Sequence, residues 1–203
     1  MQSFTRFLPL VALFALLVLG GCPTLKLGQV TVKPGSVSPT GFTLSAEVVV
    51  EETDETEGAE DQRQSGRGLL GVHVPSGWTV TAVRIRSPKE TTARALFASP
   101  QGAAAYAEAF PTTGGVWWGF ASPTQEIPKG MWTYALEVDV TVPKKTKTGD
   151  LGLSVSILNE DLSELSAPRQ YGVALKGKTL ALDERRPREG ATPVESVQAP
   201  AEG

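Results

Sequence analysis

Residues 132–142 have the sequence Trp-Thr-Tyr-Ala-Leu-Glu-Val-Asp-Val-Thr-Val, in which large apolar side chains alternate with small or polar ones. All even-numbered positions are apolar, whereas the odd-numbered positions include Glu137 and Asp139. Because successive side chains of a β-strand point to opposite faces, this pattern predicts a strand with one buried face and one solvated face.

The same alternation recurs along the chain and predicts about nine strands. Besides residues 132–142, the candidate strands are Val30–Lys33, Phe42–Val50, Leu69–Val74, Trp78–Arg86, Val116–Phe120, Leu151–Ile157, Tyr171–Leu175 and Thr179–Leu182. Turns rich in Gly and Pro separate them, and helical periodicity is almost absent. The sequence therefore predicts an all-β fold, an antiparallel two-sheet sandwich that is Ig-like or jelly-roll-like. Between Val80 and Val83 the apolar residues change from even-numbered to odd-numbered positions, which predicts a β-bulge.

An insertion near residues 99–113 interrupts this pattern. Ser99 and Pro100 fit the N-cap and first position of a short helix that continues through Ala103–Phe110. An irregular loop with an apolar plug is the alternative. Either form is expected to cover part of the sandwich.

The N-terminus has the pattern of a secretory signal. A basic start is followed by the apolar run Phe7–Leu19, which is too short to span a membrane as a helix. The run ends in Leu19-Gly20-Gly21-Cys22. Ordinary signal cleavage requires a small residue three positions before the cut, so the bulky Leu19 argues against such cleavage before Cys22.

These four residues resemble the lipobox of bacterial lipoproteins. The resemblance implies cleavage between Gly21 and Cys22 and attachment of acyl chains such as palmitate to Cys22, so that residues 1–21 are a lipoprotein signal peptide. Pro23, where an Asp would favour the inner membrane, implies an outer-membrane location, facing either the periplasm or the cell surface. A plain signal peptide or an uncleaved anchor, with Cys22 incidental, is the alternative.

The rest of the chain divides by composition. Residues 22–28 are predicted to be the lipidated Cys and a short tether, 29–182 the sandwich domain, and 183–203 a disordered tail. Within the sandwich, 51–67 is predicted to be a flexible acidic loop, because seven acids and no base fall in residues 51–61. Weak calcium attraction there stays open, but the residue order of a calcium loop is missing and no metal site is predicted.

Reactive residues are scarce. One His and one Cys exclude most Cys/His zinc sites and any intrachain disulfide, and no cofactor motif is present. His73 alternates with Val72 and Val74, so it is expected on the surface. Glu137 and Asp139 share one strand face and could serve a glycosidase, but that face is expected to meet water. The sequence therefore predicts no enzyme and no cofactor.

The adjacent Trp117 and Trp118 point to opposite faces of their strand. Val116, Trp118 and Phe120 are at alternate positions, so they share one face of the strand and are expected in the core. Trp117 is then outside, where it either stacks on a sugar ring or lies under the insertion at residues 99–113.

Together these features predict a lipid-anchored cell-envelope protein that acts as a non-enzymatic binding or assembly module. Its expected partners are the membrane, through the anchor, and an envelope protein or glycan. The net charge of −3 does not favour nucleic acid. One alternative is a carbohydrate- or peptidoglycan-binding lipoprotein with Trp117 as its platform, and a carboxylate hydrolase is the third.

Overall fold

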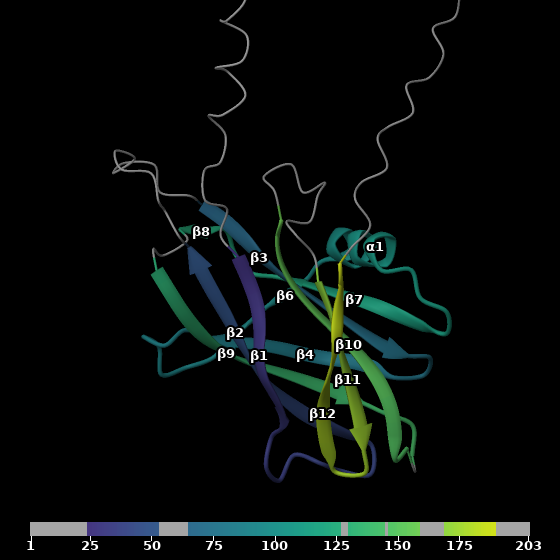
Figure 1. Cartoon of the computed structure of the whole chain (residues 1–203). Coiled ribbons are helices and arrows are strands. Elements are labelled where there is room, and N and C mark those ends of the chain that lie inside the picture. The colour runs from purple at the N-terminus through teal and green to yellow at the C-terminus, as the bar shows by residue number, and fades with distance from the viewer. Residues whose placement is uncertain (1–23, 53–64, 127–129, 145, 159–168, 190–203) are drawn as a thin grey trace, which may run out of the picture.

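A computed structural model describes residues 24–52, 65–126, 130–144, 146–158 and 169–189 (Figure 1). Within these ranges there are twelve strands and one helix. In chain order they are β1 (Thr24–Val32), β2 (Gly41–Glu52), β3 (Ser65–Pro75), β4 (Thr79–Arg86), β5 (Arg94–Ala95), β6 (Phe97–Ala98), α1 (Pro100–Ala109), β7 (Gly115–Ala121), β8 (Gln125–Glu126), β9 (Gly130–Thr141), β10 (Thr148–Leu158), β11 (Arg169–Lys176) and β12 (Thr179–Glu189).

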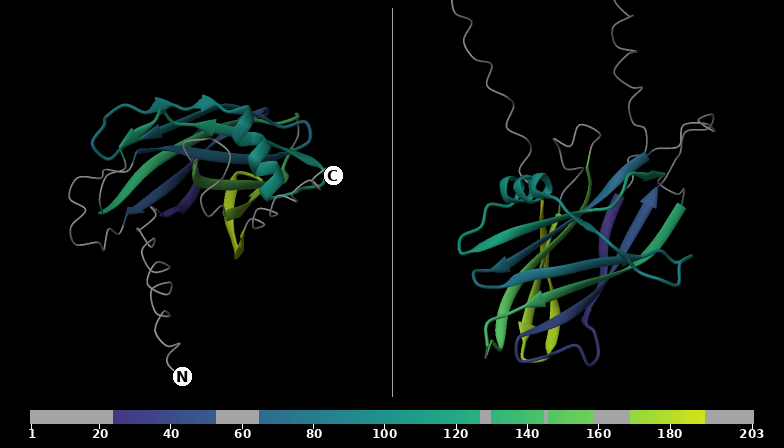
Figure 2. Two further views of the ribbon diagram at one scale, coloured as in Figure 1. Left: turned by 90° about the horizontal axis from the view of Figure 1, so that it is seen from above. Right: turned by 180° about the vertical axis from the view of Figure 1, so that it is seen from behind.

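The strands form two antiparallel sheets that pack face to face, as Figures 1 and 2 show. The first sheet has the order β1-β2-β9-β4-β5, and the second has the order β12-β11-β10-β3-β7-β6, with β8 paired to β3. The two-sheet antiparallel sandwich is thus confirmed. Each of the nine longer strands overlaps one predicted strand, and the further three, β5, β6 and β8, are two residues long.

The alternating residues of β9 explain why the first sheet has an apolar inner face. Leu136, Val138 and Val140 are at most 2% exposed, and they lie opposite the buried Ala46, Leu44 and Phe42 of β2. The second sheet contributes the alternating apolar residues of β3, β10 and β11 to the same core. The register of β4 on β9 shifts between Val80 and Ala82, which confirms the predicted bulge.

The domain is longer at both ends than the sequence predicted. The start of β1 lies within the predicted tether 22–28, and residues 24–28 belong to a strand that pairs with β2. Residues 183–189, assigned to the disordered tail, continue β12, which pairs with β11 at Asp183, Arg188 and Glu189 on either side of an irregularity. Both predictions were wrong for these residues, because an edge strand is stabilised by backbone hydrogen bonds to its neighbour and needs little apolar area of its own.

The predicted acidic loop 51–67 is also shorter than expected, since 51–52 belong to β2 and 65–67 to β3. Residues 53–64 lie outside the described residues, as do the predicted signal peptide 1–21, Cys22 and residues 190–203. Within the described ranges, no helix reaches the length and apolarity that crossing a bilayer requires.

The insertion forms the helix α1, which confirms the first of the two alternatives. The side chain of Ser99 accepts a hydrogen bond from the Gly102 amide at 3.1 Å, and Pro100 opens the helix. The helix lies on the outer face of the second sheet beside β7 (Figure 2). Two paired glycines, Gly71 of β3 and Gly119 of β7, leave room for it, because a Cβ on either would collide with the Tyr106 ring or the helix backbone.

Candidate functional site

Trp117, the predicted carbohydrate platform, is covered by α1. Its side chain is 5% exposed and stacks on the fully buried Tyr106, with ring centroids 5.3 Å apart and an interplanar angle of 19°. Its indole nitrogen donates a hydrogen bond to the Phe110 carbonyl oxygen at 3.1 Å. The prediction of an exposed stacking surface at Trp117 was therefore wrong, and the alternative, burial under the insertion, describes the structure.

The prediction that Val116, Trp118 and Phe120 lie in the core is confirmed only in part. Phe120 is in the main core and the half-buried Trp118 packs against it, but Val116 is 47% exposed. Trp117 belongs instead to a second, smaller cluster under α1. This helix cluster consists of Leu69, Tyr106, Phe110, Trp117 and Ala121.

His73 lies on the outer face of β3, as predicted, but it is half-buried rather than free in solvent. Its ring centroid is 5.4 Å from that of Trp117, and its Nε2 lies 3.0 Å from the Thr112 hydroxyl oxygen. Desolvation by this burial lowers the pKa of His73 below its ordinary value. These contacts give His73 a packing role at the edge of the helix cluster.

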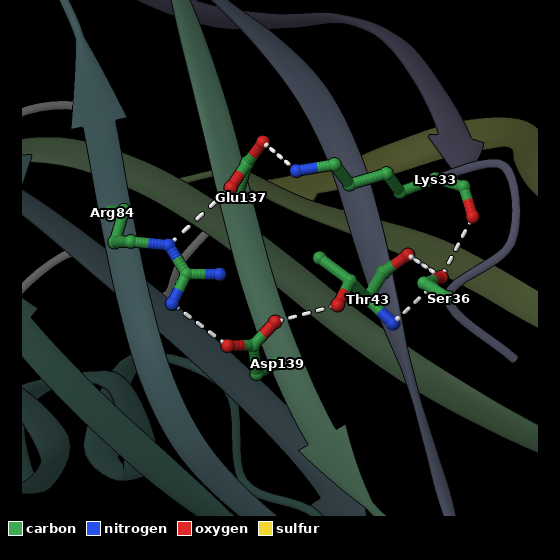
Figure 3. A network of polar contacts seen from close by, with 6 residues as sticks. All are labelled: Lys33, Ser36, Thr43, Arg84, Glu137 and Asp139. Carbon is green, nitrogen blue, oxygen red and sulfur yellow. Dashed lines mark hydrogen bonds and ion pairs between the residues drawn. The ribbon is translucent and has the colours of Figure 1, made fainter. Parts of the chain in front are cut away.

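A polar network covers the outer face of the first sheet (Figure 3). Arg84 of β4 contacts two carboxylates of β9, Glu137 at 3.3 Å through Nε and Asp139 at 2.8 Å through Nη1. Glu137 also accepts a hydrogen bond from Lys33 at 2.7 Å, and Asp139 accepts one from the Thr43 hydroxyl at 2.6 Å. The two carboxylates predicted to face water do so, and each has at least two partners.

The network lowers the pKa of both carboxyl groups. The hydrogen bond from Lys33, supported by Arg84, lowers the pKa of Glu137 despite some desolvation. Partial burial alone would raise the pKa of Asp139, but hydrogen bonds from Arg84 and Thr43 outweigh it and lower that pKa as well. A glycosidase needs one carboxyl with a raised pKa to act as the acid, so this pair is poorly suited to such a reaction.

Replacing Arg84 by Gln is expected to raise the pKa values of Glu137 and Asp139 toward their ordinary range. A carboxylate with a lowered pKa adds to the free energy of unfolding near neutral pH, and this contribution is lost as the pH falls through the folded-state pKa. The loss of stability in acid should therefore be smaller in the variant than in the wild type. At neutral pH the substitution should lower the free energy of unfolding by less than about 1 kcal/mol per ion pair, because the side chains of Arg84, Glu137 and Asp139 are partly exposed.

Carboxyl NMR titration of the Arg84→Gln variant measures this change directly. The matched control is Lys26→Gln, whose partner Glu51 lies elsewhere on the sheet. Unchanged pKa values of both carboxylates in Arg84→Gln would contradict the role of Arg84.

An apolar cavity of about 340 Å³ lies between the two sheets. Its lining includes residues near the starts of β1, β3 and β9 and near the ends of β2 and β10. These strand ends lie at the same end of the sandwich (Figure 1). The cavity lining includes buried core residues of both sheets, namely Val48, Leu70, Leu136 and Val155. Half-buried apolar residues also line it, namely Leu25, Val50, Ile85, Leu96 and Tyr134. We call this the end cavity.

The end cavity opens to solvent through polar and exposed residues. Arg94 and Thr124 line it and are exposed, and Arg94 forms an ion pair with Glu90, which also lines it. The cavity volume lies near the lower end of the range of small-molecule sites, and the combination of apolar walls with a few polar groups is typical of them. Sequence alternation shows which side chains point inward but not where they leave a space, so the end cavity could not be predicted.

The remaining predictions concern metal ligands and the lipid anchor, and the described residues bear only on the metal ligands. Within those ranges no group of three or more His, Cys, Asp or Glu side chains is arranged to hold a metal ion. The lipidation residue Cys22 and the cleavage residue Gly21 lie outside them, as does most of the acidic segment 51–61.

No family model and no curated protein matches this sequence. Among solved structures, the major pilin SpaD from Corynebacterium diphtheriae is similar with a TM-score of 0.45 and 10% identity, over 75% of this chain and 34% of the pilin. The chain thus spans about a third of the pilin's length.

Two further solved structures are more distant. AvmM, which catalyses macrocyclization in alchivemycin A biosynthesis, has a TM-score of 0.38 and 11% identity, over 75% of this chain and 88% of its own. The collagen-binding domain of a Staphylococcus aureus adhesin has a TM-score of 0.30 and 10% identity, over 79% of this chain and 95% of its own. These likenesses concern the fold, and a shared fold does not fix a function. The chain is a two-sheet antiparallel sandwich distantly similar to domains that include those of a bacterial pilin and a bacterial adhesin.

Proposed function

We propose that this protein is a lipid-anchored, non-enzymatic binding or assembly module of the bacterial cell envelope, held at the outer membrane. The observation that carries the proposal is the position of the end cavity. It lies at the same end of the sandwich as the start of β1, two residues after Cys22.

The distance from the anchor to the cavity is short. Leu25, the second residue of β1, lines the end cavity, and only three peptide units separate it from Cys22. Three residues of extended chain span about 10 Å. Acyl chains on Cys22 would therefore hold the open end of the sandwich close to the bilayer, where it meets envelope components.

The described polar groups support binding rather than catalysis. Glu137 and Asp139 are paired with cations, and His73 packs against Trp117. A rigid sandwich with an open apolar cavity provides a scaffold and a contact surface without needing a reactive group. The burial of Trp117 removes the observation that favoured a sugar platform, so an envelope protein or a lipid is the partner that we propose.

Replacing Cys22 by Ser is expected to abolish the anchor, because the thiol that would carry the lipid is lost. In the native host, metabolic labelling with a palmitate analogue should mark the wild-type protein in the membrane fraction and leave the variant unlabelled and outside that fraction. Thr24→Ser, a conservative change two residues away, is the control and should behave as wild type. Labelled or membrane-bound Cys22→Ser protein would contradict the lipid anchor.

A further inference from the structure

We propose that the end cavity binds a single acyl chain. This inference rests on the proposed function, because it names the ligand class of the same site. The cavity is built by residues far apart in the sequence, among them Val50 of β2, Ile85 of β4 and Val155 of β10. Its walls are thus supplied by both sheets and held by the sandwich itself.

The chemistry of the lining selects a hydrocarbon ligand with a polar end. Aliphatic side chains dominate the interior, so a polar group placed there would lose its hydration without gaining adequate hydrogen bonds. Four polar lining residues, Ser87, Glu90, Arg94 and Thr124, are exposed or half-buried and provide places for a head group, whereas Ser156 also lines the cavity but is buried. A ligand with one narrow apolar tail and one polar end matches this division.

The position of the cavity explains why the tail should be that of a lipid. The chain that precedes Leu25 leads within three residues to Cys22, the predicted lipidation site. Acyl chains are therefore the most concentrated apolar ligands within reach of the opening. They have two sources, the lipid on Cys22 itself and a separate lipid of the bilayer, and both present the same chemistry to the cavity.

The test uses the mature chain, residues 22–203, carrying Cys22→Ser so that no acyl chain is attached. Displacement of the fluorescent fatty acid cis-parinaric acid by octanoate, decanoate and dodecanoate measures binding below micelle-forming concentrations. Affinity should rise about fourfold for each added methylene and level off when the cavity is full. No binding of cis-parinaric acid, or affinity independent of chain length, would overturn the proposal.

A pair of matched substitutions locates the site. Val50→Trp places bulk in the end cavity and should weaken binding at least tenfold, whereas Val116→Trp, at an exposed position near the start of β7 that does not line the cavity, should leave it unchanged. Leu96→Trp, at a second half-buried lining position, provides an independent test if Val50→Trp does not fold, as judged by circular dichroism. Equal binding by the wild type and every folded cavity variant would overturn the assignment to this cavity.

A second arm distinguishes the two sources of the acyl chain. Lipidated protein purified in detergent should exclude cis-parinaric acid if a chain on Cys22 occupies the cavity, and should take it up if the ligand is a separate lipid. Failure of the fatty-acid titration would overturn this inference alone, because the membrane fractionation of Cys22→Ser tests the anchor independently.

Discussion

Replacing Trp117 by Ala is expected to lower the free energy of unfolding by about 3–5 kcal/mol, the range for removing a large buried aromatic side chain. The ring is 5% exposed, stacks on Tyr106, and holds the end of α1 through its hydrogen bond to the Phe110 carbonyl. Its loss should leave a cavity beneath the helix and an unpaired carbonyl at the helix end.

Urea unfolding, followed by circular dichroism, measures this effect. Val116→Ala is the matched control, because Val116 is the neighbour of Trp117 on the same strand and its side chain is 47% exposed. This substitution should change the free energy of unfolding by less than about 0.5 kcal/mol. A Trp117→Ala variant as stable as the wild type would contradict the packing role and reopen Trp117 as a surface residue.

Replacing Gly119 by Ala should also be strongly destabilising, although it adds only one methyl group. The new Cβ would lie 2.3 Å from the Ala103 amide nitrogen and 2.5 Å from the Ser99 carbonyl oxygen, both of which are backbone atoms. The helix must therefore shift, at a cost of about 1–3 kcal/mol or more. Loss of hydrogen-exchange protection in α1 should accompany the fall in stability.

Gly68→Ala is the matched control on β3. There the nearest atom to a new Cβ is the Ser122 hydroxyl oxygen, at an ordinary contact distance of 3.5 Å. Because alanine reduces the freedom of the unfolded chain, this variant should be neutral or slightly stabilised. Equal effects of the two substitutions would show that α1 is not packed directly on Gly119.

The alternation of apolar and polar residues predicted the fold because it shows which side chains of each strand are buried. Residues 132–141 lie in β9, and Ser99 with Pro100 marked the start of α1 correctly. The end of β12 was missed because residues 183–189 are polar, and their pairing with β11 depends on backbone atoms that have no sequence signature. Parity alone likewise could not show that Trp117 lies beneath a helix.

The candidate sites were less predictable than the fold, because they depend on contacts between distant residues. The solvated face of Glu137 and Asp139 follows from alternation, but the partners of Glu137 do not. Lys33 lies 104 residues away in the sequence and Arg84 lies 53 away, and sheet order alone brings them together. The end cavity depends in the same way on how two sheets fit at one end.

The most direct test of the account is whether the cavity end of the sandwich is the surface that contacts the envelope in the cell. A photo-crosslinking amino acid at Thr124, an exposed residue that lines the end cavity, is compared with one at Lys178, in the turn between β11 and β12. This turn lies at the opposite end of the sandwich (Figure 1). Crosslinking in intact cells, read by mass spectrometry, should attach an envelope lipid or protein at Thr124 and not at Lys178. Equal crosslinking at both positions, or none at Thr124, would contradict a binding module that acts through its cavity end.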